Sequence, residues 1–448
     1  MHKNYKHRFW GEARFFSLFR PFFVTCKACV HAGRRLLGQA LAMKPRPIPM
    51  GRLCLSGVLC IHLLCSSRSF ASQPEVTPNR AVTVEQIRQR ALEHMLKFYN
   101  EKLEDPEDFH KMTREECWRF PEGAVYPYVM PALGYVNLII DGKIEKEEAV
   151  PKIRALLEMA LIDVGRVIRV PNGDYLQLND YRDLASFVSV LNLGLSAYSL
   201  VSDDGHFKAI NDHLSLIFLT SMERSGGKSL QSWPNVIWHM DTTSALASLD
   251  LWKAPKYRAR VKLITQRHFH WRKQNETLRS GLTRAGDREN NSRGCDLSYQ
   301  LCFLPSLDPQ YSKEIYQAYC QNHWMDYRFL FGFTEWPVGT AKPGLGDFDS
   351  GPVFMQIGGT ASGMGIAAAK ANGDPMRYER LIRELSMICL FIRSAPESQL
   401  GREMLKWMQQ FVSKGIGPEY YTGFLYGDAF LFYTLSWTPY PKGNVLTD

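Results

Sequence analysis

Residues 344–374 have the sequence GLGDFDSGPVFMQIGGTASGMGIAAAKANGD. A glycine loop comes first, and Pro352 then stands where the first turn of a helix favours proline. The residues that follow are mostly glycine, alanine and serine, although each glycine costs a helix about 1 kcal/mol relative to alanine. Since a helix of such small residues allows close contact on every side, we predict a buried helix over residues 352–371.

Two kinds of predicted helix alternate along the rest of the chain. The first kind is apolar, aromatic or small on most sides, and covers residues 126–140, 184–200, 242–252, 297–304, 352–371 and 424–437. The second kind has one apolar stripe and a charged face, and covers residues 83–100, 145–164, 206–222, 256–272, 311–327 and 376–392. A helix that is apolar all round belongs to an interior, and an amphipathic helix belongs to a surface.

This alternation predicts an all-α fold. The apolar helices begin at intervals of 55 to 72 residues, which is room for one helical hairpin and a loop. Six inner and six outer helices are typical of an (α/α)6 toroid, which we expect to fill residues 81–448. An open α-solenoid is the alternative, and we find no convincing run of residues with the period of two that strands show.

The first 80 residues differ in character from the remainder. Of the formal net charge of +9, +11 falls within residues 1–71, which leaves −2 for residues 72–448 and argues against a nucleic-acid partner. Residues 50–71 contain Arg52, an apolar run and a small-x-small ending, which predicts a signal peptide. Residues 1–49 are then either an extension that is not translated or a basic, aromatic leader, and residues 72–80 are a linker. We expect a periplasmic or secreted protein without a stable membrane anchor after signal cleavage.

The cysteines indicate neither a disulfide framework nor a metal site. Five of the ten lie in the leader region, and Cys117, Cys295, Cys302, Cys320 and Cys389 remain, an odd number without metal-ligand spacing. The glycines of residues 358–365 do not follow a predicted strand, so they are no dinucleotide-binding loop. We therefore expect no cofactor.

The loops that lead into the apolar helices are long and rich in aromatic residues, whereas the opposite turns are short. In a toroid the inner helices run in one direction, so these loops would form a single mouth, which is how a scaffold presents a binding site. The predicted substrate-binding residues come from these loops: Trp233, Trp238, Trp336, Tyr126, Tyr128, Arg293, Tyr181 and Tyr421. Core packing explains the tryptophans about equally well.

Acids stand at or near the start of five apolar helices, at Asp183, Asp241, Asp296, Asp349 and Asp428. Aspartate is a preferred helix N-cap, and capping alone would explain each of them. Several carboxylates around one mouth repel one another, however, and one or two could then act as general acids. Asp347 and Asp349 are the first candidates, and Asp241 is the second.

Three other side chains are candidates for chemistry. His239 lies two residues before Asp241 and could transfer protons, unless it is a hydrogen-bonded structural histidine. Glu335 is a loop acid next to Trp336. Cys295 could be a nucleophile at a helix start, but the sequence shows no paired base for it.

The segments GDFDSGPV and WPNVIWHMDTTSALASL, together with the alternating hairpins, resemble the six-hairpin toroid superfamily. Within it, residues 120–437 are most similar in pattern to the linalool dehydratase/isomerase-like group of exported or periplasmic proteins. That resemblance implies active-site cysteines near residues 233–244, where this chain has none. The wider superfamily includes glycoside hydrolases and polysaccharide lyases that use paired carboxylates.

The leading hypothesis is an exported, metal-free enzyme with carboxylate acid/base chemistry on a hydroxylated substrate, with carbohydrate as the first choice. Asp347 or Asp349 would be the acid, and Asp241 or Glu335 the base. The alternatives are a hydro-lyase or isomerase of small alcohols, and a non-catalytic binding or scaffold protein. The separation of the two carboxyl groups distinguishes inverting from retaining glycosidases.

Overall fold

The computed structural model describes residues 82–117, 120–275, 293–328, 330–340, 346–347, 350–394, 397–408 and 420–441. All of them belong to one unit, Val82–Asp448. The predicted leader, signal peptide and linker of residues 1–80 lie outside the described residues, and so does Asp349. The described part is predominantly helical, as predicted, with five short strands.

Six of its helices are the predicted apolar ones. They are α6 (Tyr126–Ile140), α8 (Ala185–Val201), α10 (His239–Leu251), α12 (Gly294–Gln300), α15 (Gly359–Ala371) and α18 (Leu425–Ser436). Nearly every residue of α6 and α8 is buried, including the polar Asn137 and Asn192. Helices this apolar must be covered on all sides, which is why they form the interior.

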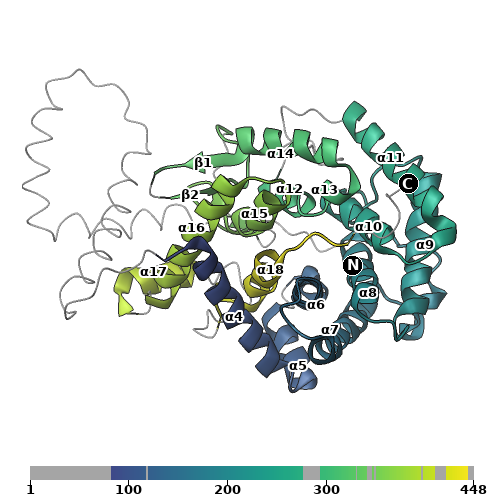
Figure 1. Ribbon diagram of the computed structural model, residues 1–448, viewed down its shortest axis with the longest axis horizontal. Helices are drawn as coiled ribbons and strands as arrows, with labels where there is room; N and C mark the ends of the chain where they lie inside the picture. Colours follow the sequence, from purple (N-terminus) through teal and green to yellow (C-terminus); the bar gives the residue numbers. More distant parts are fainter. Residues whose placement is uncertain are drawn as a thin grey trace, which may run out of the picture. The chain divides into compact units, whose positions relative to one another are not determined.

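These six helices contact one another in chain order. Contacts join α6 to α8, α8 to α10, α10 to α12, α12 to α15 and α15 to α18, and α18 also contacts α6 (Figure 1). The series therefore returns to its first member. Residues near both ends of the described chain therefore meet in one core. Tyr99, which precedes the first inner helix, stacks on Phe432 of α18 with 5.2 Å between ring centroids.

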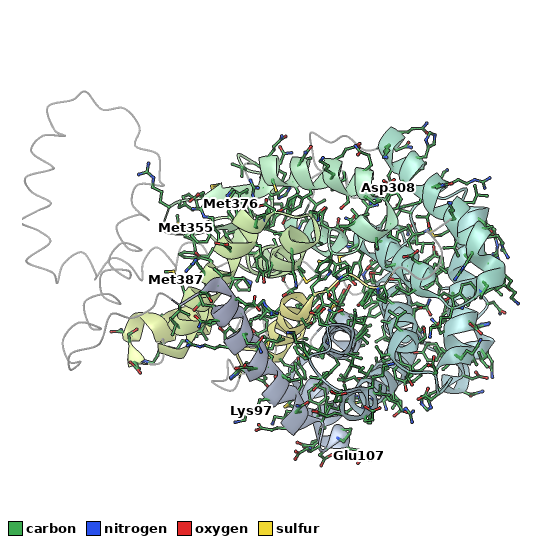
Figure 2. All side chains as sticks on the ribbon, viewed as in Figure 1. Lys97, Glu107, Asp308, Met355, Met376 and Met387 are labelled. Carbon is green, nitrogen blue, oxygen red and sulfur yellow. The ribbon has the colours of Figure 1, made fainter. Side chains whose placement is uncertain are left out.

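Amphipathic helices cover this core. They are α4 (Val84–Lys102), α5 (Pro106–Cys117), α7 (Lys146–Val167), α9 (Lys208–Arg224), α11 (Arg258–Asn275), α14 (Pro309–His323), α16 (Pro375–Ser394) and α17 (Gln399–Met408). Helix α7 contacts α6 and α8, and α9 contacts α8 and α10, so each bridges two inner helices. Figure 2 shows Lys97 and Glu107 extending outward from α4 and α5. A short helix α13 (Leu304–Leu307) follows α12.

The start of the small-residue helix corrects our prediction. Helix α15 begins at Gly359, not at Pro352, because Gly351–Phe354 is strand β4. Strand β4 pairs antiparallel with β3 (Gly346–Asp347) and with β5 (Ile357–Gly358). Met355 and Gln356 turn the chain between β4 and β5 with φ of 50° and 73°, as a two-residue hairpin turn requires. Neither is a glycine or asparagine, so the sequence carried no hairpin signal.

A second pair of strands, β1 (Trp324–Asp326) and β2 (Phe331–Phe333), follows α14. The amphipathic helix predicted for residues 311–327 therefore ends at His323. An isolated bridge between Thr334 and Ile357 joins this region to β5. The two small sheets place the residues after β2 beside the start of α12.

Within the described residues, no helix is both long enough and apolar enough to cross a bilayer.

Candidate functional site

The N-terminal ends of neighbouring inner helices are joined by side-chain hydrogen bonds. Ser186, at the start of α8, donates from Oγ to Oδ2 of Asp241 in the first turn of α10, at 2.8 Å. Asp296, in the first turn of α12, accepts from the backbone N of Met240 at 2.9 Å. Three helix starts with their two acids are thus neighbours.

Asp241 is 1% exposed, and its described side-chain partner belongs to the neighbouring helix. Helix α10 begins at His239, three residues earlier than predicted, which places Asp241 inside its first turn. Both the helix N-terminus and the Ser186 hydroxyl stabilise the ionised carboxylate there. Through Ser186, the carboxylate of Asp241 is therefore tied to the neighbouring helix α8.

Tyr126 is the first residue of α6, and it lies close enough to Asp241 of α10 for the charge of that carboxylate to act on its phenol. Burial, and after it the charge of Asp241, raises the pKa of Tyr126 well above its ordinary value, so the phenol stays protonated at neutral pH. The ring contacts Tyr299, Tyr426 and Phe430, with centroids 6.3, 6.1 and 5.1 Å away. An aromatic wall from three inner helices thus stands beside the carboxylate.

Asp296 binds the start of the neighbouring helix α10 and a side chain of its own helix. Its Oδ1 accepts from Met240 N, and its Oδ2 accepts from Nε2 of Gln300 at 2.8 Å. Gln300 in turn accepts from the buried Arg272 of α11 at 2.7 Å. This chain of hydrogen bonds ties an outer helix to the start of α10, so Asp296 serves to position the neighbouring helix.

Glu335 is fully buried and forms an ion pair with Arg293. The guanidinium of Arg293 lies 5.5 Å from the ring centroids of both Trp238 and Trp336. Cation–π contacts with the two tryptophans hold it in place. Four of the predicted site residues therefore meet in one cluster, next to the start of α10.

The backbone after β2 brings Glu335 to this cluster. Glu335 N donates to Gln356 O at 3.0 Å, and Glu335 O accepts from Gly294 N at 2.8 Å. A Cβ on Gly294 would lie 2.2 Å from Thr334 O, so only glycine permits this approach. The small strands thus fix an acid beside the first turn of α12.

Cys295 is the site residue for which the sequence showed no partner. Its Sγ donates to Oε1 of Glu335 at 3.1 Å, and its backbone N donates to Oε2 at 3.2 Å. The thiol is 5% exposed. The paired carboxylate lies 40 residues away in the sequence, so no local motif could have shown it.

His239 is buried, and its Nδ1 lies 3.1 Å from Oγ of Ser229. The contact belongs to the segment before α10, where Leu230 N also donates to Oγ1 of Thr242 at 2.9 Å. This geometry favours the structural interpretation of the histidine.

The contacts described for three other predicted binding residues lie outside this cluster. Trp233 is half-buried and packs edge-on against Phe187, with centroids 5.0 Å apart. Tyr181 accepts from Gln231 N at 3.3 Å. Tyr421 lies against His94 with centroids 5.6 Å apart.

Tyr128 lies in a different environment. Its hydroxyl donates to Oδ2 of the buried Asp163 on α7 at 2.9 Å, and His110 and Arg114 of α5 pair with the same carboxylate. Burial opposes the ionisation of Asp163, but hydrogen bonds from His110 and Arg114 outweigh it and lower its pKa. This cluster joins α5, α6 and α7 and has the features of a structural ion-pair network.

Asp428, in the first turn of α18, binds the residues that precede this helix. It accepts from Tyr421 N, Thr422 N and Oγ1 of Thr422 at 2.8, 2.7 and 2.7 Å. Burial nevertheless raises its pKa to about 6. For Asp347, the backbone alone is described, in register with Gly351.

Among the described residues, no group of three His, Cys, Asp or Glu side chains is arranged to hold a metal ion. A scan against protein-family models and a search of curated proteins both found no match to this chain.

Proposed function

We propose that the described helices form an (α/α)6 toroid of the six-hairpin superfamily. The support is the order of contacts, in which each inner helix meets the next and α18 meets α6. The hydrogen bonds between the starts of α8, α10 and α12 support a common orientation of the inner helices. In this fold the helix starts surround one mouth, where the positive ends of the helix dipoles favour anionic groups.

The mouth is the active site of an enzyme that performs general acid/base chemistry on a hydroxylated substrate. The observation that carries this proposal is the buried Asp241, which accepts from Ser186 of the neighbouring helix. Asp296 binds the backbone amide of Met240 on the neighbouring helix, and Asp428 binds those of Tyr421 and Thr422 before α18. Of these three acids, Asp241 is the one bound by the hydroxyl of another inner helix.

Asp241 acts as the proton acceptor, and Tyr126 donates a hydrogen bond to the oxygen on which negative charge develops. A phenol that remains protonated beside a carboxylate is suited to that task. Arg293 and the tryptophans around it bind the substrate. Aromatic rings offer flat apolar faces, and the guanidinium donates hydrogen bonds to hydroxyl or carboxylate oxygens.

Carbohydrate is the leading substrate class, with export to the periplasm or the outside as the corresponding location. A hydro-lyase or isomerase of small alcohols is the second candidate. It is favoured by the burial of Tyr126, Tyr299 and Tyr426, which are 3%, 1% and 9% exposed. Such a wall would suit a small apolar alcohol as well as the face of a sugar ring.

A substrate panel tests both candidates. The protein from Ser72 onward is incubated with oligosaccharides, uronic-acid polymers and small tertiary alcohols. Release of reducing ends indicates hydrolysis, a new double bond absorbing in the ultraviolet indicates a lyase, and loss of one water from the alcohol indicates a hydro-lyase. Asp308→Asn is the control, because Asp308 caps α14 through Tyr311 N at 2.9 Å and its role is structural. No turnover on any substrate would favour a binding or scaffold protein.

A further inference from the structure

The five described cysteines form no disulfide bond, and the surroundings of Cys295 differ from those of Cys302. Burial raises the pKa of Cys320 to about 11 and places those of Cys117 and Cys302 higher still, so these thiols stay protonated and inert. Cys302 donates to a neutral acceptor, the carbonyl of Ser298, at 3.3 Å. Cys295 donates instead to a carboxylate.

The contact between Cys295 and Glu335 has the geometry of a nucleophile and its base. Sγ lies 3.1 Å from Oε1, and Arg293 pairs with that same oxygen. Two backbone amides also hold Glu335: Gly294 N donates to its carbonyl oxygen, and Cys295 N donates to its Oε2. A nucleophile within hydrogen-bond reach of a base, with a third group orienting the base, is the arrangement that activates side chains in enzymes.

The ion pair with Arg293 assists the proton transfer. When the thiol proton moves to Oε1, the negative charge moves from Glu335 to Sγ and remains close to the same guanidinium. The cluster keeps one positive and one negative charge, so no unpaired buried charge is created. In Cys302 the equivalent transfer would create a thiolate beside a carbonyl oxygen.

We propose that Cys295 is the covalent nucleophile of this site, with Glu335 as its base. This inference rests on the proposed function and specifies its substrate as one with an oxygen leaving group on carbon, of which a glycoside is the leading class. The thiol gives its proton to Glu335, and Sγ forms a bond to the glycosidic carbon. The C–O bond to the leaving group breaks, and the leaving oxygen takes the proton from Glu335. Water then displaces sulfur from the carbon and gives its proton to Asp241, the proton acceptor of the proposed function, from which the proton returns to Sγ.

Alkylation of the native protein tests the reactivity without knowledge of the substrate. Iodoacetamide forms a C–S bond and releases iodide, and peptide mapping by mass spectrometry follows Cys295 and Cys302 in the same sample between pH 6 and 8. We expect Cys295 to react at least about tenfold faster than Cys302 at pH 6.5, because the thiolate is the reacting species. Glu335→Gln should remove most of this advantage, and Cys302→Ser should leave the rate at Cys295 unchanged.

Equal labelling of the two cysteines in the wild-type protein would overturn the proposal, and this comparison needs no variant to fold. Cys295→Ser supplies the second readout, because it should abolish turnover on any substrate that the panel identifies. Full turnover by Cys295→Ser would also overturn the proposal. Loss of turnover in Asp241→Asn would still support the acid/base function in that case, so the two failures are distinguishable.

Discussion

Ser186 on α8 and Asp241 on α10 are joined by a hydrogen bond of 2.8 Å at the ends of two helices that begin 54 residues apart. The bond is buried, since the two residues are 5% and 1% exposed. It fixes the direction of the carboxylate that we assign to proton transfer.

Ser186→Ala should move the acidic limb of the activity–pH profile to higher pH, because the ionised Asp241 loses a donor. The unfolding free energy should fall by roughly 1–3 kcal/mol, the usual cost of leaving a buried acceptor without its partner. The measurement is kcat/KM from pH 4 to 9. Ser199→Ala is the control at the other end of α8, where Ser199 donates only to Ser196 O. An unchanged acidic limb in Ser186→Ala would remove Ser186 from the site.

Two glycines of α15 should respond oppositely to alanine. A Cβ on Gly365 would lie 2.6 Å from Cδ2 of Phe333, whereas a Cβ on Gly363 would meet nothing within 4 Å. Gly365→Ala should therefore cost roughly 1–3 kcal/mol by overpacking. Gly363→Ala should stabilise the protein by up to about 1 kcal/mol through helix propensity. Urea unfolding of both variants measures the difference, and equal changes would refute the packing explanation of this small-residue helix.

The buried Asp428 should make stability depend on pH. Its pKa is raised to about 6 from 3.8, so the folded state binds the proton more tightly than the unfolded chain does. This contribution is present below pH 4 and is lost as the pH rises through 6, a loss of about 3 kcal/mol. Asp428→Asn should flatten the stability curve between pH 4 and 6.5, as chemical denaturation at each pH would show. Parallel curves for the variant and the wild type would contradict this assignment.

Tyr126 and Tyr128 are two residues apart and should behave differently. Tyr128→Phe removes the bond to Asp163, so it should lower the unfolding free energy by roughly 1–3 kcal/mol without changing kcat. Tyr126→Phe should lower kcat about 10- to 1000-fold, because the donor to the reacting oxygen is lost. Urea unfolding and steady-state kinetics on the pair separate the two roles. A larger loss of kcat in Tyr128→Phe would place the substrate at the α5–α7 cluster instead.

The sequence predicted those elements whose cause is local. Thr83 and Gln86 form a capping box at the start of α4, each side chain bonding to the other's backbone N–H. Helix α6 spans Tyr126–Ile140, the range that the apolar composition of this stretch predicted. The helix predicted for residues 297–304 instead divides into α12 and α13, with Pro305 in the second helical position of α13.

What the sequence could not show depends on contacts between distant segments. The hairpin of β4 and β5 uses positive φ at Met355 and Gln356, residues that carry no turn signal. Helices α5 and α17 were not predicted, because the first follows α4 closely and the second is short and rich in charge. Glu335 reaches Cys295 only through the strands, so the pairing of acid and thiol is a property of the fold.

The most direct test of the central claim is the turnover of Asp241→Asn on a substrate identified by the panel. We predict a fall in kcat of about 100- to 10000-fold, with urea unfolding close to that of the wild type and with Asp308→Asn fully active. A folded Asp241→Asn protein that retains wild-type kcat would contradict the assignment of the helix mouth as the catalytic site.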